Sequence, residues 1–169
     1  LTDEEVIARC PWATTGRTHH RTPNIITSLE LDPAEMEKRN IHLQKKYAEI
    51  EENEVRFEEL HCEDSEYLIV AFGSCARIAQ KAMEMAREEG IKVGLLRPIP
   101  LWPFPSKAIA ARAAQVKGIL TVELNAGQMV EDVRLAVKCK VPVEHFGRLG
   151  GIVPDPDEVI TALKEKLIK

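Results

Sequence analysis

An α/β fold is predicted for this chain: a three-layer α/β/α domain around a mostly parallel five-stranded sheet with one antiparallel edge strand. After residue 66, short apolar runs alternate with segments whose apolar residues recur at helical spacing, which is the pattern of βαβ units. The first run, YLIVAF at residues 67–72, is apolar throughout, as in a strand buried on both faces. Residues 55–60, VRFEEL, instead alternate apolar and charged side chains, which is typical of a half-exposed edge strand.

The other elements follow from the same periodicities and from the positions of glycine and proline. Further strands are expected at residues 92–96, 118–123 and 141–145. Helices are expected at residues 75–89, 106–115, 129–137 and 155–167. Asp155-Pro156-Asp157-Glu158 supports the start of the last helix, because it combines a capping aspartate, a first-turn proline and a glutamate that reaches back. Residues 97–105, RPIPLWPFP, hold four prolines in nine positions and should form a rigid loop.

Two segments precede the α/β domain, which is expected to occupy residues 54–169. Residues 1–31 show no sustained apolar period and are interpreted as an extended arm or linker. Residues 32–53 should form a linker helix that begins at Asp32-Pro33-Ala34-Glu35. The narrow apolar stripe of this helix suits either a helix that lies over a domain or partner, or a solvated charged helix.

The composition argues against several classes of function. The net charge of -4 and the pI of about 5.8 predict binding neither to nucleic acid nor to an anionic membrane surface. No apolar run approaches the roughly 20 residues of a membrane span. The N-terminus, LTDEEVIARC, lacks the blocks of a signal peptide, so a cytoplasmic location is expected. It also lacks an initiator methionine, which suggests a fragment of a longer chain.

No metal, cofactor-binding or catalytic residue is predicted from the sequence pattern. The turn after residues 67–72 has a single glycine and matches neither a dinucleotide fingerprint nor a P-loop. The pair His19-His20 has no third ligand nearby. The cysteines contain no C-x-x-C pair, so free thiols in a reducing compartment are expected rather than a zinc or iron–sulfur site. They are Cys10, Cys62, Cys75 and Cys139.

Two aromatic residues stand out in the proline-rich loop, Trp102 and Phe104, since the chain is only 5% aromatic. Exposed aromatic side chains on a rigid loop make good interface anchors. The alternative is that both side chains fold back onto the core of their own domain. The residues alone leave both interpretations open.

Polar residues gather where the strand at residues 118–123 ends: Glu123, Asn125 and Gln128. Arg148 lies on the corresponding loop after the next strand. Because the carboxyl ends of parallel strands meet at one edge of a sheet, these residues are expected to form a polar cluster there. A catalytic acid–base pair would need a second positioned carboxylate, so interface contacts or loop-fixing hydrogen bonds are predicted instead.

Three motifs in this order resemble the C-terminal part of the 2-oxoacid:ferredoxin oxidoreductase α chain, of the 2-oxoisovalerate or 2-oxoglutarate type. They are RPIPLWPFP at residues 97–105, VELNAGQMVEDVRLAV at residues 122–137 and FGRLGGIVPDPDEV at residues 146–159. Residues 15–47 also resemble the linker of that family, with His20-Arg21 in place of acidic residues. The resemblance implies a transketolase C-terminal-like fold, which agrees with the fold class predicted from the patterns.

The resemblance also implies a function. Enzymes of this family convert a 2-oxoacid, coenzyme A and oxidised ferredoxin to acyl-CoA, CO2 and reduced ferredoxin, using thiamine diphosphate with Mg²⁺ and iron–sulfur clusters. The expected partners are a thiamine-binding β chain, a γ chain and a ferredoxin-like chain. The sequence resembles only the second domain of the α chain, so an assembly role without catalysis is expected of this fragment. The alternatives are a free-standing small-ligand-binding domain and a purely structural α/β domain.

Overall fold

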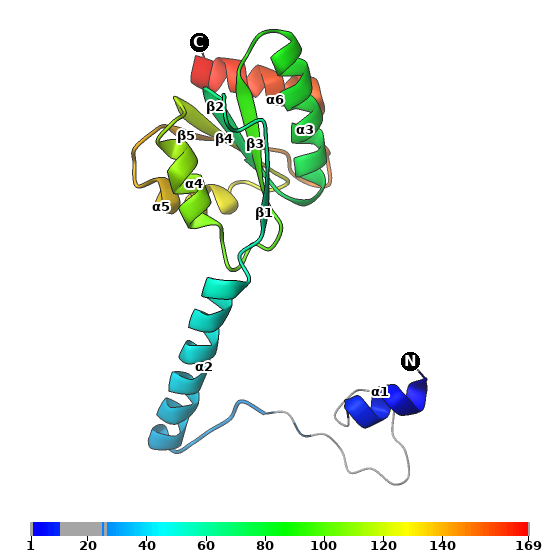
Figure 1. The fold of residues 1–169 in the computed structure, drawn as a ribbon, viewed down its shortest axis with the longest axis vertical. Helices are drawn as coiled ribbons and strands as arrows, with labels where there is room; N and C mark the ends of the chain where they lie inside the picture. The colour runs from blue at the N-terminus through cyan, green and yellow to red at the C-terminus, as the bar shows by residue number, and fades with distance from the viewer. Residues whose placement is uncertain (1, 11–24, 26, 169) are drawn as a thin grey trace. The chain divides into compact units, whose positions relative to one another are not determined.

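The structure of the chain is a computed structural model that describes residues 2–10, 25 and 27–168 (Figure 1). The chain divides into two compact units, Leu1–Leu43 and Gln44–Lys169. The sheet lies entirely within the second unit. The paired histidines at positions 19 and 20 lie outside the described residues.

The first unit contains a short helix, α1 (Asp3–Arg9). An extended arm or linker was expected over residues 1–31, and within that range residues 3–9 form this helix. Its physical cause is a pair of reciprocal capping hydrogen bonds. The Glu5 carboxylate accepts a hydrogen bond from the Thr2 amide at 2.8 Å, and the Thr2 hydroxyl accepts one from the Glu5 amide at 3.3 Å.

A long helix, α2 (Pro33–Asn53), begins where the sequence predicts a start signal. The Asp32 carboxylate accepts a hydrogen bond from the Ala34 amide at 2.8 Å and so satisfies one of the free amides of the first turn. None of the residues of α2 is buried. Among the residues that the structure describes, no helix combines the length and the apolar character needed to cross a membrane.

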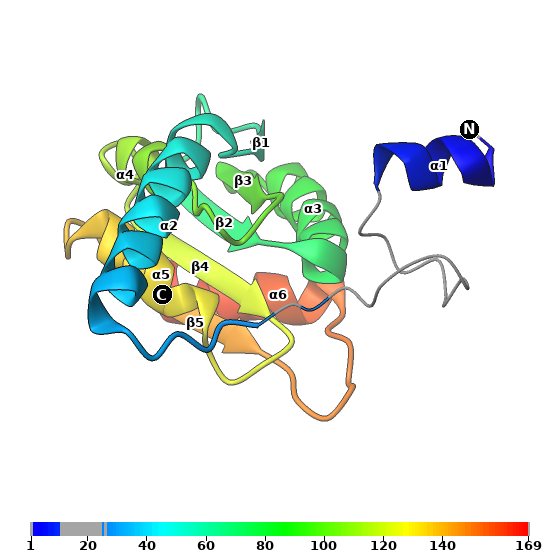
Figure 2. The same cartoon turned by 90° about the horizontal axis from the view of Figure 1, so that it is seen from below.

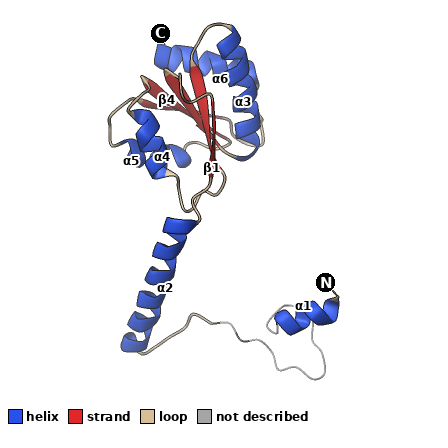
Figure 3. Ribbon diagram, in the orientation of Figure 1, coloured by secondary structure: helices blue, strands red, loops and turns tan. Residues whose placement is uncertain are grey.

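The second unit is built on a five-stranded sheet in the order β1-β3-β2-β4-β5. Figure 3 shows its strands in red between the helices. The strands are β1 (Phe57–Leu60), β2 (Tyr67–Ala71), β3 (Val93–Pro98), β4 (Gly118–Glu123) and β5 (Val143–Gly147). Only β1 runs antiparallel, against β3, and the other three pairs are parallel. The predicted fold class, with one antiparallel edge strand, is therefore confirmed.

Helices cover both faces of this sheet (Figure 2). The pair on one face is α3 (Gly73–Glu88) and α6 (Pro156–Leu163), which continues into the π-helical turn η1 (Lys164–Ile168). The pair on the other face is α4 (Ser106–Ala113) and α5 (Met129–Val137). The chain thus forms the three layers that the alternation of patterns predicts.

Two apolar clusters, one on each face of the sheet, form the core. Ile69 and Ala71 of β2 belong to the cluster beneath α3 and α6, whereas Leu68 and Val70 belong to the cluster beneath α4 and α5. Successive side chains of a strand point to opposite faces, so a strand covered by helices on both sides must be apolar at every position. This is the physical reason for the uninterrupted YLIVAF run.

An ion pair fastens the edge strand β1 to α4. The Arg112 guanidinium donates two hydrogen bonds to the Glu59 carboxylate, at 2.9 and 2.7 Å, and both side chains are largely shielded from solvent. The hydrogen bonds from Arg112 hold the pKa of Glu59 below its ordinary value and raise the pKa of Arg112. A short edge strand with charged residues is thereby held to the domain.

Candidate functional site

Glu123 is the last residue of β4 and lies at the centre of the predicted polar cluster. Its side chain is fully buried and points to the N-terminus of α5. The carboxylate accepts hydrogen bonds from the amides of Met129 at 2.8 Å, Val130 at 3.0 Å and Gln128 at 3.3 Å. Gln128 at the start of the helix makes no side-chain cap of its own. Glu123 therefore caps α5 from the preceding strand and places a negative charge at the positive end of the helix dipole.

His145 on β5 completes this cluster, although it was not among the residues selected from the sequence. One ring nitrogen, Nδ1, lies 3.4 Å from the Glu123 carboxylate and 3.3 Å from the hydroxyl of Thr121. The other, Nε2, lies 3.3 Å from the carbonyl oxygen of Asn125. Thr121 and His145 are direct neighbours across β4 and β5. A threonine inside the apolar strand GILTVE was the one available signal that a polar partner lies beside it.

The loop after β4 is folded tightly by its own residues. The Asn125 side chain accepts a hydrogen bond from the amide of Gly127 at 2.8 Å, and Gly127 has a φ of +112° that favours glycine. Gly147 of β5 touches this loop, because a Cβ atom there would lie 2.2 Å from the Asn125 carbonyl oxygen. The loop is therefore packed directly against the end of β5.

The predicted members of the cluster divide into two groups. Glu123, Asn125 and the backbone of Gln128 come together around the start of α5. Arg148 contributes only its backbone amide, which donates to the Glu123 carbonyl oxygen at 3.3 Å. Its guanidinium turns toward α6 and lies 3.4 Å from the carboxylate of Glu158.

This arrangement can fix the loop after β4 and the start of α5. The Glu123 carboxylate is fully buried and accepts three backbone hydrogen bonds at the start of α5, which suits a structural cap. Cys75 on α3 lies near the Glu123 carboxylate. Burial, and to a smaller extent the negative charge of Glu123, raises the pKa of the Cys75 thiol. Within residues 2–10, 25 and 27–168, no three metal-binding side chains converge.

The two aromatic residues of the proline-rich loop behave differently from one another. Trp102 is 51% exposed and packs edge-on against Tyr47, with ring centroids 5.7 Å apart. Its peptide bond to Pro103 is cis. Phe104 is half-buried and packs against the core cluster beneath α4 and α5. Phe104 therefore folds back onto the core of its own domain, whereas the role of Trp102 as an interface anchor stays a prediction.

Exposed apolar side chains surround the cluster on the loops that follow β3, β4 and β5. Each of them is between 45% and 58% exposed. They are Ile99, Leu101, Trp102, Leu124, Leu149, Ile152 and Val153, and together they are called the apolar rim. All follow the carboxyl ends of strands, so they share one edge of the sheet. Exposed apolar side chains gathered at one edge are a feature of interaction surfaces.

The family model named pyruvate:ferredoxin oxidoreductase core domain II matches residues 65–159. The ketoisovalerate oxidoreductase subunit VorB of Methanothermobacter thermautotrophicus is 44% identical over 165 residues, which cover 96% of this chain and 46% of VorB. The 2-oxoglutarate synthase subunit KorA of Archaeoglobus fulgidus is 32% identical over 143 residues, which cover 83% of this chain and 40% of KorA. The chain thus spans less than half the length of these relatives.

Solved structures share the fold. One is the 2-oxoglutarate:ferredoxin oxidoreductase of Magnetococcus marinus, solved with 2-oxoglutarate, coenzyme A and succinyl-CoA bound. It matches 80% of this chain with a TM-score of 0.68 and 25% identity, and the match covers 24% of that chain. A split-gene transketolase, solved as an inactive β4 tetramer, matches 67% of this chain and 41% of its own, with a TM-score of 0.57. At 20% identity, the second similarity shows a common fold alone.

Proposed function

Because the chain belongs to the pyruvate:ferredoxin oxidoreductase core domain II family, we propose that it is the C-terminal part of the α chain of a 2-oxoacid:ferredoxin oxidoreductase. Similarity to VorB and KorA supports the 2-oxoisovalerate or 2-oxoglutarate type. The whole complex would convert a 2-oxoacid, coenzyme A and oxidised ferredoxin to acyl-CoA, CO2 and reduced ferredoxin. This chain would serve the assembly of that complex and would be inactive alone.

One observation carries the proposal of assembly rather than catalysis. α/β enzymes place their sites at this edge of the sheet. The buried carboxylate found there, that of Glu123, accepts hydrogen bonds from the first amides of α5. The loops at the same edge expose the apolar rim to solvent. A domain that contributed chemistry would keep a polar group free there, whereas a domain that contributes contacts would present apolar side chains.

The cofactors of the complex would be held outside this part of the α chain. Iron–sulfur clusters need several converging thiolates. Here Cys62 is buried, with its thiol pKa raised by burial to about 11, and Cys139 is exposed on a different part of the domain. The described residues do not fit such a cluster or the carboxylate ligands of Mg²⁺. Thiamine diphosphate, Mg²⁺ and the clusters would be bound elsewhere in the complex, the diphosphate, Mg²⁺ and clusters by the β, γ and ferredoxin-like partners, and the free thiols suit a cytoplasmic location.

Co-expression with the thiamine-binding β chain of the same complex tests the proposal. The two chains should co-elute in gel filtration, and paired Leu124→Asp and Leu149→Asp substitutions in the apolar rim should abolish co-elution. Leu135→Asp is the matched control, since Leu135 is 73% exposed on α5 and lies outside the rim. Calorimetry of the isolated chain with thiamine diphosphate should show no binding. Tight binding of the cofactor, or co-elution that survives the rim variants, would overturn the proposal.

A further inference from the structure

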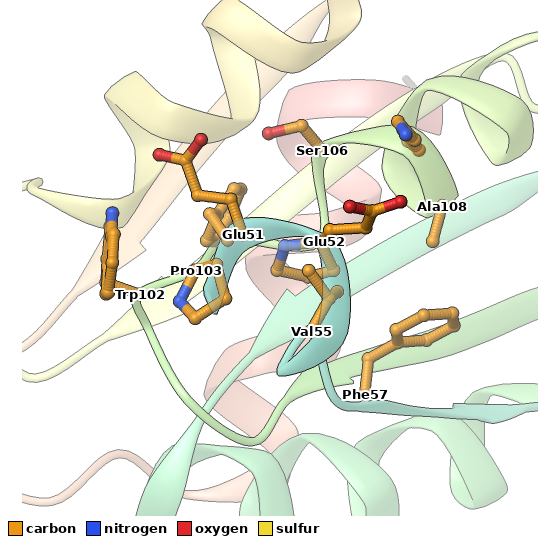
Figure 4. Close-up of a pocket in the computed structure, with 11 residues that line it drawn as sticks. Glu51, Glu52, Val55, Phe57, Trp102, Pro103, Ser106 and Ala108 are labelled. Carbon is orange, nitrogen blue, oxygen red and sulfur yellow. The ribbon is translucent and has the colours of Figure 1, made fainter. Parts of the chain in front are cut away.

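A groove lies between the end of α2 and the proline-rich loop, within the unit Gln44–Lys169 (Figure 4). Its volume is about 760 Å³, within the size range of binding sites for small molecules and side chains. Apolar side chains form much of its surface, among them Val55, Phe57 and Phe104. None of the residues that hold the Glu123 cluster together lines it. The groove is therefore a separate feature of the domain.

The walls of the groove are preformed. Pro103 and Pro105 are buried beneath it and fix the backbone of the loop. Phe104 anchors the same loop in the core, and Tyr47 of α2 packs edge-on against Trp102. A site that exists before its occupant arrives loses little conformational entropy on binding.

Aromatic surface nevertheless remains open to solvent along the groove. Trp102 is 51% exposed and Phe57 is 39% exposed, although the chain has only two tryptophans and four phenylalanines. Partly exposed tryptophan beside a pocket is typical of the residues that dominate binding energy in interfaces. These two side chains are suited to receive apolar groups of an occupant.

The groove also carries unbalanced negative charge. Glu51 and Glu52 are both exposed, and neither forms an ion pair within the part of the chain that the structure describes. Figure 4 shows their carboxylates projecting from the end of α2 on two sides, that of Glu51 toward Trp102 and that of Glu52 toward Ala108. Lys107 is the one basic residue of the lining.

We propose that this groove binds an extended segment of another subunit in which an arginine is flanked by apolar residues. The guanidinium would lie between the Glu51 carboxylate and the exposed face of Trp102, and the flanking side chains would contact Phe57 and Pro103. Arginine suits this position better than lysine, because its planar group stacks on an indole while it donates to a carboxylate. The assignment of the segment to another subunit rests on the proposed function.

Fluorescence of Trp102 gives a direct test. In a Trp12→Phe background Trp102 is the sole tryptophan, and its emission should change saturably on titration with acetyl-Leu-Arg-Leu-Pro-amide. Glu51→Gln should weaken this binding by roughly three- to fivefold, the effect of losing one partly exposed charge pair. Glu49→Gln is the matched control, because Glu49 is exposed on the same helix but does not line the groove.

Two further peptides make the test specific. The peptide with glutamate in place of arginine should not bind, and the peptide with serine in place of both leucines should bind more weakly. Equal binding of the arginine and glutamate peptides, no saturation at millimolar concentration, or no effect of Glu51→Gln would overturn the inference. If the peptide fails while the β chain still co-elutes, the groove assignment alone falls. If the peptide binds while co-elution fails, the proposed assembly function falls and peptide recognition stands.

Discussion

Substitution of Glu123 by glutamine would test the role of the buried cap. The carboxylate uses one oxygen for Met129 and Gln128 and the other for Val130. In glutamine one of these oxygens becomes an NH2 group, so at least one amide of α5 faces a donor instead of an acceptor. The charge at the helix N-terminus is lost as well.

The magnitude follows from these contacts. One buried amide left without an acceptor, together with the loss of charge from the remaining bonds, should lower the free energy of unfolding by about 2–3 kcal/mol. Glu123→Ala removes both acceptor oxygens, and with them all three hydrogen bonds, and leaves a cavity, so it should lower that free energy by about 3–5 kcal/mol. Losses of this size are a large fraction of the stability of an ordinary domain.

Urea unfolding followed by circular dichroism is the appropriate assay, with an unchanged slope as evidence that the same surface unfolds. Glu131→Gln is the control. Glu131 is exposed in the first turn of α5, so the loss of its charge reports the helix-dipole effect alone. It should lower the free energy of unfolding by about 0.3–0.5 kcal/mol. If Glu123→Gln lowered stability no more than Glu131→Gln does, the capping role would be refuted.

Two other substitutions test the packing of the domain. Arg112→Ala should lower the free energy of unfolding by about 1–2 kcal/mol at neutral pH, since it removes the two hydrogen bonds to Glu59. Because the pKa of Glu59 is lowered in the folded state, the stabilisation by this ion pair is fully present above about pH 4.3, the ordinary pKa of a glutamate. It disappears as the pH falls through the folded-state pKa of Glu59. Arg112→Ala should therefore lower the free energy of unfolding less at about pH 3, and an equal loss at both pH values would contradict the prediction. Gly147→Ala should cost about 2–3 kcal/mol in urea unfolding, because the new methyl group would meet the Asn125 carbonyl oxygen. Gly73→Ala, at a φ of +55° but in open space, should cost only about 1–2 kcal/mol, and equal losses in the two variants would argue against the clash.

Local patterns predicted the layers well, because they depend on burial within each segment. The uninterrupted apolar run of β2 and the helical spacing in α3 and α5 each require only that one element has covered faces. The predicted strand at residues 141–145 is displaced to Val143–Gly147. The cause is Pro142, which has no amide to donate and so contributes only its carbonyl oxygen, to Ile119.

The cluster at the sheet edge was predictable only in part, because its contacts join distant segments. Glu123 and Asn125 lie two residues apart at the end of β4, so their proximity follows from the sequence itself. The partnership with His145 depends on the register of β4 against β5, and no pattern within either strand fixes that register. The direction of the Arg148 side chain likewise depends on the position of Glu158 on α6.

The placement of the helix cap on a strand links the local and the global stability of this region. α5 has only nine residues, too few to be stable alone in water. Its first turn is completed by a carboxylate that is positioned only when β4 is paired within the sheet. Local unfolding of the turn between β4 and α5 would therefore break this cap. The amide hydrogens of Met129 and Val130 should exchange with solvent only when the whole domain unfolds. A partner would then meet this edge as a rigid template.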